Sequence, residues 1–83
     1  MQRKLWQIEL FSNDEVSILD TVGDATEAVA NAAAYMGFTR KDLDYDANVT
    51  YLCQTGELRM EQGGWKNGKH YHELILITEW KDD

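Results

Sequence analysis

Apolar and polar residues alternate over the first twenty positions, which is the pattern of half-buried strands. Trp6, Ile8 and Leu10 alternate with polar residues in the run 5–11, and the run 16–20 is a second short extended segment. The intervening S-N-D-E supplies turn-forming residues. The pattern therefore predicts a β-hairpin at the N-terminus.

The apolar spacing then changes to that of a helix. Asp24 is placed to cap its N-terminus and Gly37 to end it. The small apolar residues of this segment share one broad face: Ala25, Ala28, Val29, Ala32, Ala33 and Met36. We expect this alanine face to pack on a sheet, with docking of a partner helix as the alternative.

Alternation returns from residue 48 onward, and T-G at 55–56 and N-G at 67–68 mark two turns. With two-residue loops, Met60 opposes both Tyr51 and Ile75 in a three-stranded meander, and the glycine pair 63–64 introduces a bulge. The expected fold is α+β: one alanine-rich helix packed on a largely antiparallel sheet, order ββαβββ. Residues 1–83 form a single globular domain.

The second face of this expected sheet is unusually apolar, because it carries Leu52, Leu74, Leu76 and Trp80. Such a face is too apolar to be left in water. Either the N-terminal hairpin wraps over it or another chain covers it.

Composition points to a globular protein of the cytoplasm. The 83 residues are 43% hydrophobic and include a single cysteine, Cys53, so an internal disulfide is excluded and a reducing compartment is expected. The longest unbroken aliphatic run, 74–77, is too short to cross a bilayer, and the N-terminus lacks the continuous apolar core of a signal peptide.

The charge balance narrows the choice of partners. Fifteen acidic and eight basic side chains give a net charge of −7, and residues 12–46 hold eight of the acids and two of the bases. This charge repels phosphate backbones and anionic lipid, so we expect no direct nucleic-acid binding and no membrane association. A cationic protein partner is favoured; the plainer interpretation is that the charge only maintains solubility.

One acidic run spaces carboxylates two residues apart, at Asp42, Asp44 and Asp46. In an extended segment this spacing is about 6.6 Å and is similar to that of successive phosphates, which would suit a nucleic-acid mimic. Alternatively, Thr39 caps a short helical turn, the three carboxylates point in different directions, and the run is a solvated loop.

Basic and aromatic residues interleave only at the expected hairpin tip W-K-N-G-K-H-Y, residues 65–71. Three interpretations remain open: a solvated turn, a finger that contacts a protein with Trp65 as its anchor, and a nucleic-acid-binding ribbon.

Catalytic and metal motifs are missing. His70 and His72 lie on one side of a strand, but a third ligand is not evident. Cys53 is expected to be a buried, inert thiol, and no glycine has the spacing of a phosphate-binding or dinucleotide-binding loop. We therefore expect no enzymatic activity, no cofactor and no metal.

The run K-L-W-Q-I-E-L-F-S-N-D-E-V-S-I-L, followed by D-A-T-E-A-V-A-N-A-A-A-Y-M-G-F and an expected strand, resembles small host-takeover proteins of lytic bacteriophages, in particular their RNA-polymerase inhibitor. The resemblance covers roughly residues 3–53 and is one of pattern, so no functional residue transfers individually. It implies a class: short proteins that bind and disable a bacterial machine.

The leading hypothesis is therefore a small acidic inhibitor of phage type in a bacterial cytoplasm, which blocks a basic or nucleic-acid-binding surface of a host enzyme or defence complex. Its expected partner-binding residues are Asp14, Glu15, Asp20, Asp42, Asp44, Asp46, Trp65, Lys66, Asn67 and Lys69. The alternatives are a homo-oligomeric structural or regulatory module, such as a homodimer, and a small metal-dependent enzyme.

Overall fold

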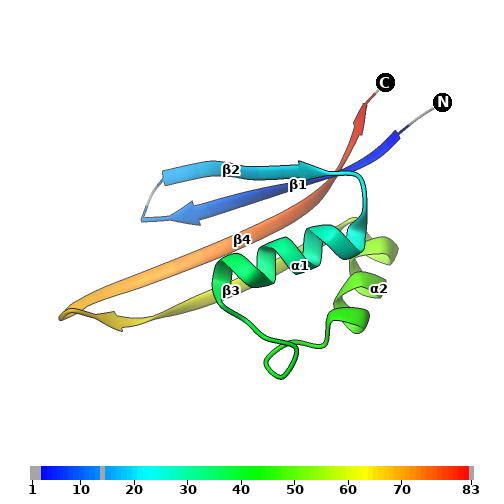
Figure 1. Cartoon of the computed structure of the whole chain (residues 1–83). Helices are drawn as coiled ribbons and strands as arrows, with labels where there is room; N and C mark the ends of the chain where they lie inside the picture. The colour runs from blue at the N-terminus through cyan, green and yellow to red at the C-terminus, as the bar shows by residue number, and fades with distance from the viewer. Residues whose placement is uncertain (1–2, 14, 83) are drawn as a thin grey trace.

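One four-stranded antiparallel sheet carries two helices on the same face in the computed structural model, which describes residues 3–13 and 15–82 (Figure 1). The order of strands across the sheet is β2-β1-β4-β3. The elements in chain order are β1 (Arg3–Ser12), β2 (Glu15–Val22), α1 (Ala25–Met36), α2 (Tyr45–Thr55), β3 (Glu57–Lys66) and β4 (Lys69–Asp82).

The N-terminal hairpin predicted from alternation is confirmed, because β1 and β2 pair from Trp6↔Val22 to Ser12↔Glu15. Their register shifts by one residue between Ile8 and Glu9. The extra residue on β2 is Leu19, whose half-buried side chain packs against the core. This bulge bends the outer strand of the sheet.

The second hairpin is also confirmed at its turn. Asn67 and Gly68 both have positive φ, 53° and 75°, as a two-residue turn between twisted strands requires. The expected bulge at residues 63–64 is wrong, since β3 and β4 pair without a shift from Glu57↔Thr78 to Lys66↔Lys69. Gly63 has a different role: a Cβ there would lie 2.9 Å from the carbonyl oxygen of Tyr71.

The alanine-rich helix agrees with the sequence prediction. The side chain of Asp24 accepts a hydrogen bond from the backbone N–H of Thr26, and Gly37 ends α1 with a φ of 77°. All six residues of the expected alanine face are buried. Ala28, Val29 and Ala32 are fully buried, so the helix lies close to the sheet and does not offer this face to a partner.

The expected strand at residue 48 onward is wrong, because this segment forms the second helix, α2. The side chain of Asp44 accepts from the backbone N–H of Ala47 at the start of α2, and Gly56 ends it with a φ of 80°. Tyr45, Val49 and Leu52 recur at helical spacing and are the residues of α2 that pack against the core. Their burial outweighs the β-propensity of the local sequence.

The order of elements is therefore ββααββ, and the expected ββαβββ order with its three-stranded meander is corrected. Residues 55–56 end a helix and are not a hairpin turn. Tyr51 does not pair with Met60, although the predicted pairing of Met60 with Ile75 is confirmed. Leu52 belongs to α2 and is fully buried, so it is not on the second face of the sheet. Cys53 is exposed, whereas the sequence predicted a buried thiol.

The hydrophobic core lies between the helices and one face of the sheet. Alternate strand residues supply its sheet side, among them Ile8, Leu10, Ile75 and Ile77, while α1 contributes its alanine face and α2 contributes Leu52. A single layer of helices on a single sheet gives a flat molecule with principal extents of 51 × 28 × 17 Å.

The longest dimension follows the β3–β4 hairpin. β1 pairs with β4 only as far as Ser12↔Glu73, whereas β4 continues with β3 to the turn at 67–68. Residues 63–72 therefore project beyond the sheet as a two-stranded ribbon, which we call the finger (Figure 1).

Candidate functional site

The side of the sheet opposite α1 and α2 is covered by no part of the chain that the structure describes. We call it the open face. Apart from Trp65 on the finger, its apolar members come from β1, β2 and β4, and they alternate along each strand with the core residues. They are Leu5, Phe11, Val16, Ile18, Leu74, Leu76 and Trp80.

Three of these apolar side chains are exposed to water, and the other four are half-buried. Ile18 is 64% exposed, Val16 57% and Trp80 49%. The expectation that the N-terminal hairpin might wrap over this face is wrong, because β1 and β2 belong to the same sheet and extend it. The open face is thus broader than the sequence indicated, with Leu52 removed from it.

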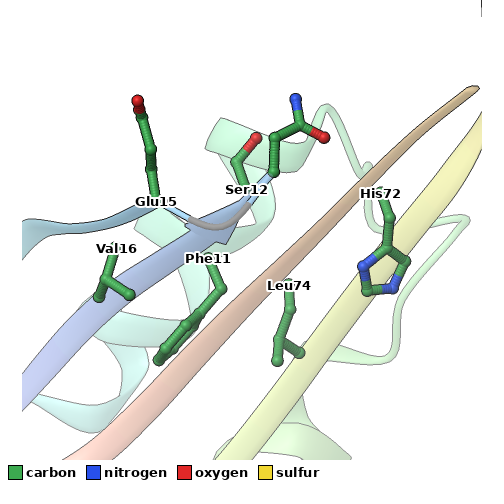
Figure 2. Close-up of a pocket in the computed structure, with 7 residues that line it drawn as sticks. Phe11, Ser12, Glu15, Val16, His72 and Leu74 are labelled. Carbon is green, nitrogen blue, oxygen red and sulfur yellow. The ribbon is translucent and has the colours of Figure 1, made fainter. Parts of the chain in front are cut away.

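A shallow hollow of about 430 Å³ marks one end of the open face. Phe11, Val16 and Leu74 supply its apolar surface, and His72 and Glu15 lie at its rim (Figure 2). In Figure 2, Phe11 and Val16 of the first hairpin and Leu74 of β4 point to the same side of the strands, whereas Glu15 points away from them. The hollow is open to solvent and its polar groups do not converge on one point, so it fits a protruding apolar side chain better than a reacting substrate.

Carboxylates lie among and beside the apolar residues of the open face: Glu9 lies between Ile18 and Leu76, and the others are on β3. Glu9, Glu57 and Glu61 lie on this face by strand alternation. Arg59 is the only lysine or arginine there among the side chains that the structure describes, and its Nη2 lies 3.6 Å from Glu57 Oε1. The Nε2 atom of His72 lies 3.1 Å from Glu61 Oε2.

The acidic run lies apart from the open face, in the connection between α1 and α2. Asp42 accepts hydrogen bonds from the backbone N–H and the hydroxyl of Thr39, and these bonds lower the pKa of its carboxyl below the ordinary value of 3.8. Asp44 caps α2 and Asp46 lies in the first turn of that helix. The three carboxylates are thus arranged by turn and helix geometry, not as an extended row.

Two of the remaining acidic candidates are on β2. Glu15 is exposed at the start of the strand, and Asp20 is exposed near its end, where its carboxylate accepts from the backbone N–H of Thr21. Asp14 lies outside the described residues. The structure therefore distributes the acidic candidates between the β2 edge and the helical side of the molecule, and does not gather them into one patch.

The basic and aromatic candidates come together on the finger. Trp65 is 75% exposed and its ring meets that of His70 edge to face, at a centroid distance of 5.5 Å. Lys66 and Lys69 pair across the turn that Asn67 helps to form. The finger is thus a segment separate from the acidic run, which lies in the connection between α1 and α2 (Figure 1).

Groups with catalytic potential are dispersed. His70 contacts Trp65 and His72 contacts Glu61, while Cys53 is exposed on α2. Among the described residues no three histidine, cysteine or acidic side chains cluster so as to hold a metal ion. No helix in the same residues is long and apolar enough to span a bilayer.

Four members of the open face were missed by sequence reasoning: Leu5, Phe11, Val16 and Ile18. The signal was present, because Leu5 and Phe11 are the apolar residues of the first strand that fall out of phase with Trp6, Ile8 and Leu10. A strand with apolar residues in both phases indicates burial on both faces or a second contact surface.

No family model, curated protein or solved structure matches this chain.

Proposed function

We propose that this chain is a non-catalytic protein-binding module of the inhibitor type, which uses the open face to bind a protein whose own surface combines apolar and basic side chains. The observation that carries the proposal is the apolar strip formed by Phe11, Val16, Ile18, Leu74 and Leu76, which no described part of the chain covers. Val16 and Ile18 are exposed and the other three are half-buried. Monomeric proteins seldom leave such a contiguous strip in water.

Charge defines the chemistry of the partner. Glu9 lies within the strip, where it pairs with both Ile18 and Leu76, while Glu57 and Glu61 lie beside the strip on β3. Among the side chains that the structure describes, Arg59 is the one lysine or arginine on this face, and the whole chain carries −7. Lysines or arginines on the partner would meet these carboxylates while its apolar residues cover the strip. Electrostatic complementarity of this kind speeds association, which then slows as salt screens the charges.

Face-to-face pairing of two copies fits the same surface less well. It would bring the carboxylates of one open face against those of the other, and among the side chains that the structure describes Arg59 is the one lysine or arginine of each copy to compensate. Like charges held close together at an interface are unfavourable. A basic partner is therefore preferred to a second copy on this face.

The target class rests on the resemblance to host-takeover proteins of bacteriophages. The hairpin of β1 and β2 and the capped helix α1 agree with that pattern, while α2 occupies the place of the expected strand. We therefore keep a basic surface of a bacterial enzyme or defence complex, of the kind that nucleic acid occupies, as the proposed target.

Two substitutions test which face is used. Ile18→Arg places a positive charge in the apolar strip, whereas Tyr35→Arg places the same residue on α1, where the tyrosine is 50% exposed. Immobilised wild-type protein and both variants are incubated with bacterial lysate at low and high salt. We expect a basic protein that is captured by the wild type and by Tyr35→Arg, is lost with Ile18→Arg, and is released by salt.

The opposite result would reject the assignment. Capture that survives Ile18→Arg but fails with Tyr35→Arg would assign binding to the helical side. Capture that requires the carboxylates of Asp42, Asp44 and Asp46 would restore the acidic run as the contact.

A further inference from the structure

β3 is an edge strand, and the backbone N–H and C=O groups of every second residue along its outer edge point away from the sheet. The two-residue turn makes Lys66 and Lys69 the first hydrogen-bonded pair of the hairpin, so even-numbered residues of β3 bond to β4 and odd-numbered residues point outward. Glu57 confirms this alternation, because its N–H and C=O both bond to Thr55 Oγ1. The outward groups of Arg59, Glu61, Gly63 and Trp65 have no such partner among the described residues.

The other edge of the sheet is protected in ways that β3 is not. β2 has the bulge at Leu19, and the carboxylate of Asp20 occupies the N–H of Thr21. A bulge is a usual protection of an edge strand against pairing with another chain. Along β3 the edge is regular from residue 57 to 66.

From this contrast we propose that two copies of the chain pair antiparallel through their β3 edges, with the two-fold axis at Gln62. In this register Arg59 lies opposite Trp65 of the second copy, and Glu61 lies opposite Gly63 of the second copy. All four outward residues of each copy are then hydrogen-bonded. The inference goes beyond the proposed function, because it uses the edge of the sheet and leaves the open face free.

Side chains favour the same register. Arg59 and Trp65 lie on one face of the sheet and are both highly exposed, so each guanidinium can stack on an indole of the second copy. Glu61 meets a glycine and therefore no like charge directly opposite. The dimer thus provides a partner for Trp65, which has only His70 as an aromatic neighbour in the single chain.

Neighbouring registers are poorer. Centring the axis on Glu61 places its carboxylate directly opposite the Glu61 carboxylate of the second copy, which is a pair of like charges. Centring it on Met60 leaves Trp65 unpaired and requires the backbone of Glu57, which Thr55 already occupies. Only the register centred on Gln62 uses the whole free edge.

Pairing of one edge buries little surface, and each copy carries −7. The dimer should therefore be weak, depend on concentration, and strengthen as added salt screens the repulsion between copies. This salt dependence is opposite to that expected for the basic partner of the open face, so the two proposals fail or succeed separately.

Disulfide trapping tests the register. At the two-fold axis the Gln62 residues form a non-hydrogen-bonded pair with Cα atoms about 4.5 Å apart, within the range that a disulfide spans. Gln62→Cys in a Cys53→Ser background should form a covalent dimer in a glutathione redox buffer. Ser17→Cys, on the exposed β2 edge, is the matched control and should remain monomeric.

Sedimentation velocity of the unmodified chain gives an independent reading. We expect a reversible dimer that is lost with Trp65→Ala and with Arg59→Glu, while circular dichroism of both variants stays that of the wild type. A chain that remains monomeric at every concentration and salt, or a Gln62→Cys variant that crosslinks no faster than Ser17→Cys, would overturn the proposal.

Discussion

At the residue scale, the acidic side chains of the connection between the helices are occupied by local hydrogen bonds. Thr39 and Asp42 form a reciprocal turn, since the Asp42 carboxylate accepts from the Thr39 N–H and the Asp42 N–H donates to the Thr39 carbonyl. The Asp44 carboxylate accepts a hydrogen bond from the backbone N–H of Ala47 and so caps α2. The spacing of these carboxylates is therefore set by a turn and a helix cap, not by an extended chain.

The lowered pKa of Asp42 gives a prediction at this scale. Hydrogen bonds from Thr39 favour the charged carboxylate, so the folded pKa lies below the ordinary 3.8. The stabilisation is present above that value and is lost as the pH falls through the folded pKa. An NMR titration should show the Thr39 amide following this low pKa, and Asp42→Asn should abolish the transition. An Asp42 pKa at or above 3.8 would contradict the hydrogen-bond assignment.

At the element scale, the sequence predicted the hairpins and the first helix because their determinants are local. The N-G turn, the Asp24 cap and the alanine face each lie within a dozen residues. The segment 45–55 was misread because Val49, Thr50 and Tyr51 favour strands. Its helical signals, the Asp44 cap and the spacing of Tyr45, Val49 and Leu52, became decisive only through packing on the core.

Leu52 provides the test of this correction. It is fully buried on α2 while its neighbour Cys53 is exposed. Leu52→Ala should lower the free energy of unfolding by about 2–5 kcal/mol, since a cavity replaces a core side chain. Cys53→Ala should change it by no more than about 0.5 kcal/mol. Urea denaturation of both variants measures the difference, and equal effects would contradict the helical assignment of residues 45–55.

At the scale of the whole molecule, one flat layer of helices covers one face of the sheet and leaves the other bare. Sequence alternation predicted an apolar second face with Leu74, Leu76 and Trp80, and the structure places all three residues on the open face. It failed to show that the first hairpin joins the sheet beside β4, because pairing between distant strands is not encoded in local pattern. The sequence therefore predicted that a second, apolar face exists, but it did not predict that β1 and β2 contribute to this face.

The free energy of unfolding of Ile18→Arg, measured at low protein concentration, tests most directly whether the open face is free in the folded chain. Ile18 is 64% exposed in the middle of β2, so an arginine there should remain in water. We predict a change of no more than about 0.5 kcal/mol from the wild type, as at other surface positions. A loss of about 2 kcal/mol or more, the effect of a charge placed in a core, would mean that the chain itself covers this face.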